Sequence, residues 1–300
     1  MLLNCILPID KPAGMTSHDV VARVRRLFRP AKVKVGHAGT LDPDATGLLL
    51  VCLGAATRLA DLLADEGKSY AARFVLGTAT TTEDASGEIV SAADASGVTR
   101  AQVEAALENL TGEIAQTPPM VSAVHHEGRR LYELARQGIT VEREARRVRI
   151  DRIALTAFEP GAAAAGEMRV DCGKGTYIRT LCADLGAALG VGGHMSHLRR
   201  TRIGRFGVEG ALPLDGLDLD AVERGATGAS QAVSFLPLRR LTDGEVAEIG
   251  QGRAMAAGEI VGAPHASGWV RLEAPDGALA ALALVGEDGQ RLLPKKVLLA

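Results

Sequence analysis

A short loop between residues 36 and 46 concentrates side chains that could carry out chemistry. It holds a histidine, two threonines and two aspartates, at His37, Thr40, Asp42, Asp44 and Thr46. Asp42 precedes a proline, which disfavours helical backbone angles and stiffens the chain there. The apolar run that follows over 48–53 is typical of a strand buried on both faces. The pattern predicts a carboxylate held near the core, able to act as a nucleophile or a base. The simpler interpretation is an aspartate that only ends a turn.

The stretch G-H-A-G-T-L-D-P-D-A-T-G at 36–47 resembles the catalytic motif of the TruB-type tRNA pseudouridine synthases. The same motif occurs in the related enzymes of the guided RNA-modification particles. The resemblance implies that Asp42 is the catalytic aspartate. It also implies that His37 is a wedge or stacking group beside the catalytic loop.

Further segments follow the family's order, so that the resemblance covers most of residues 4–210. They are D-K-P-A-G-M-T-S at 10–17, K-S-Y at 68–70, P-P-M-V-S-A at 118–123 with R-R-L-Y-E-L-A-R-Q-G at 129–138, and K-G-T-Y-I-R-T at 174–180 with H-M-S-H-L-R-R-T-R at 194–202. By resemblance, Tyr70 stacks on the target base and Leu198 lies under it. Tyr177 is expected to bind the substrate, and Arg179 to pair with the catalytic aspartate. The segments between 118 and 138 resemble the mobile insertion with which this family grips RNA.

Elementary electrostatics supports the role of Arg179. Burial alone raises the pKa of a carboxylate, and a nearby guanidinium offsets that effect. Arg179 is a candidate because Gly173 and Gly175 let the backbone approach closely. The alternatives are a surface arginine at a helix start, a Tyr70 that only packs in a core strand, and a Leu198 that only packs in the core.

The charge distribution bears on nucleic-acid binding. The chain has 34 basic and 36 acidic residues, and its net charge of −2 argues mildly against a nucleic-acid protein. However, all charged residues between Val20 and Leu41 are basic, directly before the Asp42 loop. Such a run is often only a solvated face, but arginine also suits phosphate oxygens. The residues that we expect to contact the RNA backbone are Arg23, Lys32, Lys34, Arg129, Arg130, Arg146, Arg199 and Arg200.

Several other kinds of site lack the residues they need. The pairs His125–His126 and His194–His197 have no neighbouring cysteine or carboxylate ligands, so we expect no metal. G-K-G-T at 173–176 is not a P-loop. The four cysteines form no C-x-x-C pair and are expected to be buried thiols in a reducing cytosol. We expect no signal peptide and no transmembrane helix, hence a cytoplasmic location.

Strand and helix patterns mix along the chain without a regular βαβ repeat. Thr16 or Ser17 can begin a helix with one apolar face, and Thr99 with Gln102 is a capping box. A short helix is expected over 129–137. Strands are expected over 70–76, 147–158 and 168–172. The fold class is therefore predicted as α+β, with a mixed, largely antiparallel sheet.

Two domains are expected. Residues 1–235 would form a pseudouridine synthase catalytic domain, with the RNA-gripping insertion at about 115–150. The pattern loosens near 213–234, and short strands at 269–273, 278–285 and 291–299 suit a compact β-rich module. In the resembled family this module is often a small PUA-type RNA-binding domain, which we expect over 236–300.

The resemblance implies an enzyme that isomerises uridine 55 in the T loop of tRNA to pseudouridine. The uridine is flipped out of the stack, its glycosidic bond is cleaved and the base is rejoined through carbon. This redox-neutral isomerisation implies no cofactor. The expected partner is the tRNA T stem-loop, with no membrane and no obligate protein partner, and the chain is expected to be a monomer. One alternative is a guided synthase acting on ribosomal RNA with partner proteins, although no long lysine-rich tail is present. Another is an RNA-binding or tRNA-folding protein whose catalysis is secondary.

Overall fold

The computed structural model describes residues 4–29, 31–122 and 124–299. Ala123, in the expected insertion, lies outside these ranges. The chain divides into two compact units. Unit 1 comprises residues 1–43, 48–64 and 208–300, and unit 2 comprises residues 44–47 and 65–207. Strands and helices mix in both units, which confirms the α+β class.

The first part of unit 1 contributes several strands to the large sheet, and residues of α1 (Ser17–Leu27) and α6 (Leu219–Gly225) share a buried cluster with them. Its elements before residue 235 are β1 (Cys5–Lys11), α1 (Ser17–Leu27), β2 (Val35–Ala38), most of β3 (Thr46–Leu53), η1 (Gly54–Leu59), α2 (Ala60–Asp65), η2 (Val208–Gly210), β14 (Leu212–Pro213), α6 (Leu219–Gly225), β15 (Thr227–Gly228) and α7 (Ala229–Ala232). β1 pairs with β14 in parallel and with β15 antiparallel, while β2 and β3 form an antiparallel pair.

The helix expected after Thr16 is present as α1. Thr16 is its N-cap, and Thr16 and Asp19 form a capping box that satisfies the first free amides. One face of α1 carries Val20, Val21 and Val24, which belong to the same buried cluster as apolar residues of β1 and β3. This packing fixes the sheet edge from which the Asp42 loop emerges.

The remainder of unit 1 has its own sheet and core. Its elements are β16 (Leu238–Arg240), α8 (Asp243–Gly250), β17 (Met255–Ala256), β18 (Trp269–Glu273), β19 (Leu279–Val285) and β20 (Arg291–Val297). The strand order is β16-β18-β19-β20-β17. Ile249 of α8 packs in a cluster with Val270, Ala281 and Leu292 of this sheet. The C-terminal part of the chain is therefore β-rich, as expected.

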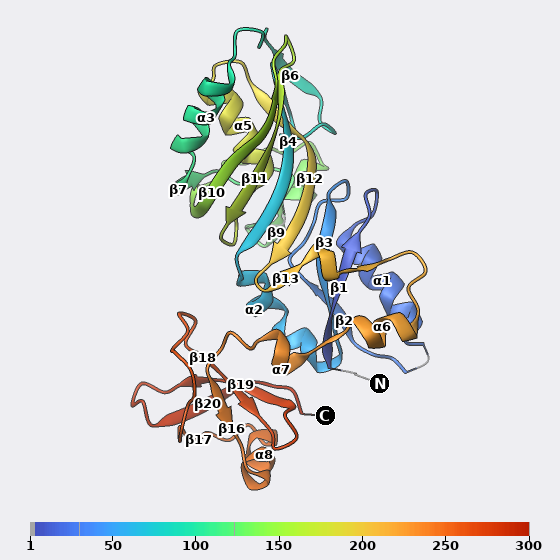
Figure 1. Cartoon of the computed structure of the whole chain (residues 1–300), viewed down its shortest axis with the longest axis vertical. Helices are drawn as coiled ribbons and strands as arrows, with labels where there is room; N and C mark the ends of the chain where they lie inside the picture. The colour runs from blue at the N-terminus through green and yellow to red at the C-terminus, as the bar shows by residue number, and fades with distance from the viewer. Residues whose placement is uncertain (1–3, 30, 123, 300) are drawn as a thin grey trace. The chain divides into compact units, whose positions relative to one another are not determined.

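Unit 2 is built on four long strands. Its elements are β4 (Lys68–Leu76), β5 (Thr78–Thr80), β6 (Ile89–Ala92), α3 (Arg100–Asn109), β7 (Gly112–Gln116), β8 (His125–His126), β9 (Arg129–Arg130), α4 (Leu131–Ala135), β10 (Arg146–Glu159), β11 (Ala165–Cys172), α5 (Ile178–Ala188), β12 (Gly193–Ile203) and β13 (Phe206–Gly207). The order is β12-β4-β11-β10-β7, antiparallel throughout. Figure 1 shows α3 and α5 lying together against these strands. The capping box of Thr99 and Gln102 begins α3, as predicted.

The expected insertion contains little regular structure. Between β7 and β10 it holds only the β8–β9 pair and α4 among the described residues. The helix predicted over 129–137 is shorter, because Arg129 and Arg130 pair with the β8 histidines instead of joining the helix. Within the parts of the chain that the structure describes, no helix has the length and apolar character that a membrane crossing requires.

Candidate active site

A buried lysine in unit 1 holds the Asp42 loop through hydrogen bonds to backbone carbonyls. Lys11 is 0% exposed. Its Nζ donates to the carbonyls of Pro12 at 2.8 Å, Met15 at 2.6 Å and Pro43 at 2.8 Å. A buried ammonium group is costly unless it is fully hydrogen-bonded, and these carbonyls supply its three acceptors. The backbone that follows Asp42 is thereby tied to the end of β1.

Leu41, the residue before Asp42, is also held by hydrogen bonds. The hydroxyl of Ser17 accepts from the Leu41 amide at 2.9 Å and donates to the Leu41 carbonyl at 3.1 Å. The Gly14 amide also donates to the Pro43 carbonyl at 3.0 Å. Asp42 itself is half-buried. The carboxylate thus stands between two residues whose backbone positions are fixed by hydrogen bonds.

His37 lies at the start of this loop, on β2. It pairs with Val51 of β3 and is half-buried. After Pro43 the chain enters unit 2, where Thr46 pairs with Arg199 and Gly47 with Arg200. Gly47 has φ +100°, and a Cβ there would lie 2.2 Å from the Arg200 carbonyl oxygen. Only glycine fits this close approach.

Tyr70 and Leu198 lie on one face of the β4–β12 pair. Tyr70 is opposite Arg200, and Leu198 is opposite Ala72. Residues directly opposite in an antiparallel pair, and residues two apart in a strand, share a face. Tyr70 and Leu198 are therefore diagonal neighbours. Both are nearly buried, at 8% and 7% exposed.

Arg179 is buried at 3% exposed in the first turn of α5. Its guanidinium donates to the carbonyls of Thr82 at 3.2 Å and Val121 at 2.8 Å. It also lies 3.7 Å from Asp84 Oδ2. Each of these partners is in unit 2. The predicted pairing of Arg179 with Asp42, a residue of unit 1, stays a prediction.

Asp84 was not expected at the site. Its Oδ1 accepts from the hydroxyls of Thr82 and Ser86, both at 2.6 Å, and from the Ser86 amide at 3.0 Å. These bonds hold the carboxylate facing Arg179. The sequence D-A-S-G predicts the turn but gives no sign that its aspartate meets an arginine far along the chain.

The preceding residue, Glu83, ties the same loop to the sheet and to α5. Its carbonyl accepts from the Met195 amide at 3.0 Å, and its carboxylate accepts from the Thr180 hydroxyl at 2.6 Å. Burial raises the pKa of Glu83 above its ordinary value, and the Thr180 hydrogen bond opposes that shift. Arg179 is therefore surrounded by groups that are themselves fixed.

Tyr177 is the N-cap of α5 and is half-buried. Its own side chain makes no capping hydrogen bond. The backbone of Tyr177 is instead held by the side chain of Gln116 from β7. This contact was also not expected from the sequence.

The residues expected to contact RNA phosphates differ in exposure. Five are exposed, namely Lys32, Lys34, Arg129, Arg130 and Arg146, whereas Arg23 and Arg199 are half-buried. Arg23 is paired with Asp215 at 3.0 Å. Arg200 is different, because it is only 1% exposed and its guanidinium is enclosed.

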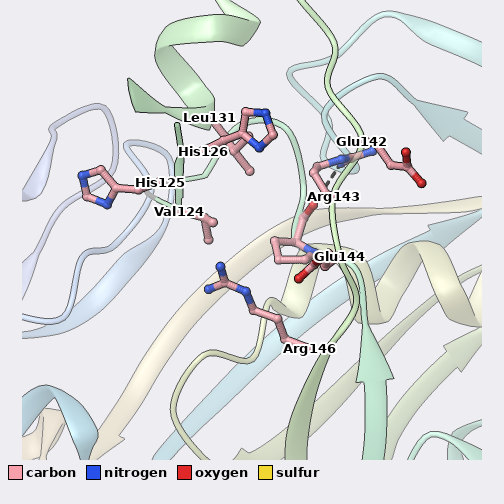
Figure 2. Close-up of a pocket in the computed structure, with 9 residues that line it drawn as sticks. Val124, His125, His126, Leu131, Glu142, Arg143, Glu144 and Arg146 are labelled. Carbon is pink, nitrogen blue, oxygen red and sulfur yellow. Dashed lines mark hydrogen bonds between the residues drawn. The ribbon is translucent and has the colours of Figure 1, made fainter. Parts of the chain in front are cut away.

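The insertion contains an open cavity of about 470 Å³ (Figure 2). Its lining residues are Pro118, Val124, His125, His126, Leu131, Glu142, Arg143, Glu144 and Arg146. Arg143 Nη1 donates to the Pro118 carbonyl at 2.9 Å and so closes the insertion onto its own start. In Figure 2 the guanidinium of Arg146 extends toward Val124. The cavity combines hydrogen-bond donors, acceptors and apolar surface.

The four cysteines are buried and unbonded to one another, as expected. Burial raises the pKa of Cys5 and Cys172 to about 11 and that of Cys52 to about 12. These groups are protonated thiols at neutral pH and poor nucleophiles.

Comparisons with known proteins agree on one family. The model of the TruB family pseudouridylate synthase N-terminal domain matches residues 25–178, and that of the tRNA pseudouridylate synthase B C-terminal domain matches residues 179–243. A tRNA pseudouridine synthase B of Mycobacterium sp. (strain KMS) is 48% identical over 295 residues, covering 98% of this chain and 95% of that protein. The protein of the same description in Mycobacterium tuberculosis (strain CDC 1551 / Oshkosh) is 49% identical over 261 residues, or 86% of each chain.

Two solved structures are similar over nearly the whole chain. The crystal structure of a Cbf5-Nop10-Gar1 complex contains a chain with a TM-score of 0.75 and 28% identity, covering 99% of this chain and 86% of that one. An H/ACA RNP bound to a substrate RNA containing 2'-deoxyuridine contains a chain with a TM-score of 0.72 and 27% identity, covering 100% of this chain and 86% of that one.

Proposed function

The chain belongs to the TruB family of pseudouridylate synthases, and on that premise we propose that it isomerises uridine 55 in the T loop of tRNA. The observation that carries the proposal is the Asp42 loop. Its carboxylate stands between Leu41 and Pro43, whose backbone groups are hydrogen-bonded to the side chains of Ser17 and Lys11. Fixing a reacting group in advance avoids the entropy cost of ordering it during the reaction.

We assign Asp42 the covalent or proton-abstracting step. The glycosidic bond between the uracil nitrogen and the ribose breaks, the base turns, and its C5 carbon joins the ribose. The proton on C5 is lost and one is gained at nitrogen, so atoms and electrons balance. Arg179 is proposed to pair with Asp42 and keep it ionised, because a guanidinium favours the charged form of a carboxylate. Asp84, whose Oδ2 lies 3.7 Å from Arg179 Nη1, then holds Arg179 in place.

The β4–β12 pair supports the proposed binding of the flipped base. Diagonal neighbours on an antiparallel pair are about 7–8 Å apart. A flat ring that lies between two side chains and contacts both needs a separation of about twice 3.5–4 Å between them. Tyr70 and Leu198 are such neighbours, so we propose that they enclose the uracil. Tyr177 is proposed to bind the same nucleotide, and His37 to prop the space that the flipped base leaves.

Phosphate contacts are proposed for the exposed and half-buried basic residues. They are Arg23, Lys32, Lys34, Arg129, Arg130, Arg146 and Arg199. Arg200 is left out of this set, because only 1% of its surface is exposed. We propose that the insertion cavity accepts part of the RNA, with Arg146 at its edge.

We propose a catalytic domain over 1–235 and a PUA-like RNA-binding module over 236–300. The separate core of Ile249, Val270, Ala281 and Leu292 supports a module that folds around its own sheet. The similar Cbf5 chain is in a complex with Nop10 and Gar1. We propose that the present chain acts as a monomer on tRNA without such partners.

The test is tritium release from unmodified tRNA transcript labelled at C5 of uridine, with the purified chain and no added protein. We expect release from wild type, none with Asp42→Asn, and none from a transcript with cytidine at position 55. Asp44→Asn is the matched control, because Asp44 is an exposed carboxylate in the same loop, and it should retain most of the activity. Release that persists in Asp42→Asn contradicts the assignment of the catalyst.

The second candidate function is RNA binding or tRNA folding with secondary catalysis. The basic residues of the insertion favour it equally. It predicts that Asp42→Asn binds tRNA normally and rescues the biological role of the wild type in a deletion strain. If wild type binds tRNA tightly and releases no tritium, the synthase proposal fails.

A further inference from the structure

Gln116 makes two hydrogen bonds to one residue of the proposed site. It is the last residue of β7 and is 2% exposed. Its Nε2 donates to the Tyr177 carbonyl at 3.1 Å, and its Oε1 accepts from the Tyr177 amide at 2.8 Å. The two residues are 61 positions apart in the chain. A buried side chain therefore fixes both polar backbone groups of Tyr177.

The position of this contact matters for α5. Tyr177 is the N-cap of the helix, and the Tyr177 carbonyl also accepts the first helical hydrogen bond, from the Leu181 amide at 3.1 Å. A tyrosine side chain cannot cap as serine or aspartate does. Gln116 instead accepts from the amide of the N-cap residue itself, the bond that the side chain of the third helical residue makes in a capping box. Among side chains that are normally uncharged at neutral pH, only a carboxamide offers a donor and an acceptor in this fork.

Arg179 follows Tyr177 by two residues and lies in the turn that Gln116 fixes. Its guanidinium spans the Thr82 and Val121 carbonyls. A shift of the helix start would move Tyr177 and Arg179 together. Misplacement of a reacting group by about 1 Å can cost about 10²-fold in rate.

We infer that Gln116 is a positioning residue of the reaction, which sets Tyr177 and Arg179 through the backbone at the start of α5. The inference rests on the proposed roles of those two residues. Gln116 also marks the point where β7 passes into the insertion, whose Val121 carbonyl accepts from Arg179. The side-chain carboxamide of Gln116 thus links the start of the insertion to the start of α5.

The first test compares Gln116→Leu with wild type under single turnover. We expect the rate of tritium release to fall by about 10- to 100-fold, while the Kd for tRNA changes by less than about twofold. Gln251→Leu is the matched control, because Gln251 is exposed at the end of α8, and it should leave both quantities unchanged. An unchanged rate in Gln116→Leu overturns the inference, as does a change confined to Kd.

The second test keeps the inference falsifiable if Gln116→Leu is unstable. In Gln116→Glu a carboxylate accepts from the Tyr177 amide but faces the Tyr177 carbonyl with no proton to donate. Only the protonated carboxyl restores both bonds. Burial and the facing carbonyl raise the pKa of this group, whereas the cations of Arg146, opposite in β10, and of Arg179 lower it. Glu113 is the other ionisable residue of β7.

We expect the rate of Gln116→Glu, divided by that of wild type at the same pH, to rise at least about fivefold from about pH 8.5 to about pH 6. The same ratio for Gln116→Leu should stay flat. Recovery of the rate with no change in the folded fraction, measured by circular dichroism at both pH values, separates positioning from a merely structural role. A flat ratio for Gln116→Glu overturns the inference. Absence of tritium release from wild type would instead be a failure of the proposed function.

Discussion

Lys68 and Arg200 put two cationic side chains on one buried face of unit 2. Arg200 is opposite Tyr70, and Lys68 lies two residues before Tyr70 on the same strand. The Lys68 ammonium donates to the Glu66 carbonyl at 2.8 Å. Burial, reinforced by the charge of Arg200, lowers the pKa of Lys68 from 10.5 to about 8. A lysine beside the proposed base site therefore loses its proton more readily than a surface lysine.

This depressed pKa makes the stability of the fold depend on pH. Below about pH 8 both the folded and the unfolded chain hold the proton, and the cost of burying the charge is fully present. Between about 8 and 10.5 the unfolded chain binds more protons, so stability rises with pH. The free energy of unfolding of wild type, relative to that of Lys68→Met, should rise by roughly 2 kcal/mol between about pH 7.5 and pH 10, at about 1.36 kcal/mol per pKa unit.

Urea unfolding of both proteins at about pH 7.5 and pH 10 measures this gain. Lys295→Met is the control, because Lys295 is exposed, and its difference from wild type should not change with pH. A constant difference between wild type and Lys68→Met would show that Lys68 titrates normally in the folded chain.

At the scale of elements, the first residues of β3, which follow the Asp42 loop, approach β12 very closely within unit 2. Gly47 adopts φ +100°, and a side-chain carbon at this position would stand only 2.2 Å from the Arg200 carbonyl oxygen. Gly47→Ala must therefore push β3 away from β12 or distort its own backbone. Either change also displaces the loop that holds Asp42.

We expect Gly47→Ala to lower the free energy of unfolding by at least about 2 kcal/mol and to lower the rate of tritium release. Gly210→Ala is the matched control. Nothing lies within 4 Å of a Cβ at Gly210, so its effect should be within about 0.5 kcal/mol. Equal stability of the two variants in urea would show that the β3–β12 contact relaxes without cost.

Local patterns predicted the elements well where the information is local. The capping box of Thr99 and Gln102 and the helix after Thr16 are in the structure as expected. The contacts that orient Arg179 and Tyr177 were not predictable in this way. Asp84 and Gln116 act on residues far along the chain, Arg179 and Tyr177, and the second pair is 61 positions apart. No periodicity or turn rule in the sequence carries such a pairing.

At the scale of the whole molecule, a net charge of −2 coexists with clusters of basic side chains. Phosphate binding depends on local charge, and the counterions it releases make affinity sensitive to salt. The acidic residues are partly used inside the fold, as in the pair of Arg239 and Glu245 at 2.7 Å. Overall charge is therefore a weak guide to this protein's partner.

Binding of tRNA should weaken by about 10³-fold between about 50 mM and 200 mM salt, the effect of about six phosphate contacts. Replacing Arg129 and Arg130 together by glutamine should flatten the dependence of log Kd on log salt. Arg100→Gln is the control, because Arg100 lies on α3 and pairs with Glu104 at 2.8 Å. Filter binding across a salt series measures the slopes. Equal slopes for the double variant and wild type would remove both arginines from the phosphate contacts.

Unit 2 interrupts unit 1 in the chain, and this has a consequence during translation. β1 needs β14 and β15 as neighbours, yet these strands are about 200 residues later, at 212–213 and 227–228. At about 5–20 residues per second, the ribosome takes roughly 10–40 s to supply them. Residues 65–207 are complete earlier and have all their strand partners. The nascent chain can thus form its arginine-bearing unit first, whereas β1, whose Lys11 holds the aspartate loop, gains β14 and β15 only after residue 228 has been made.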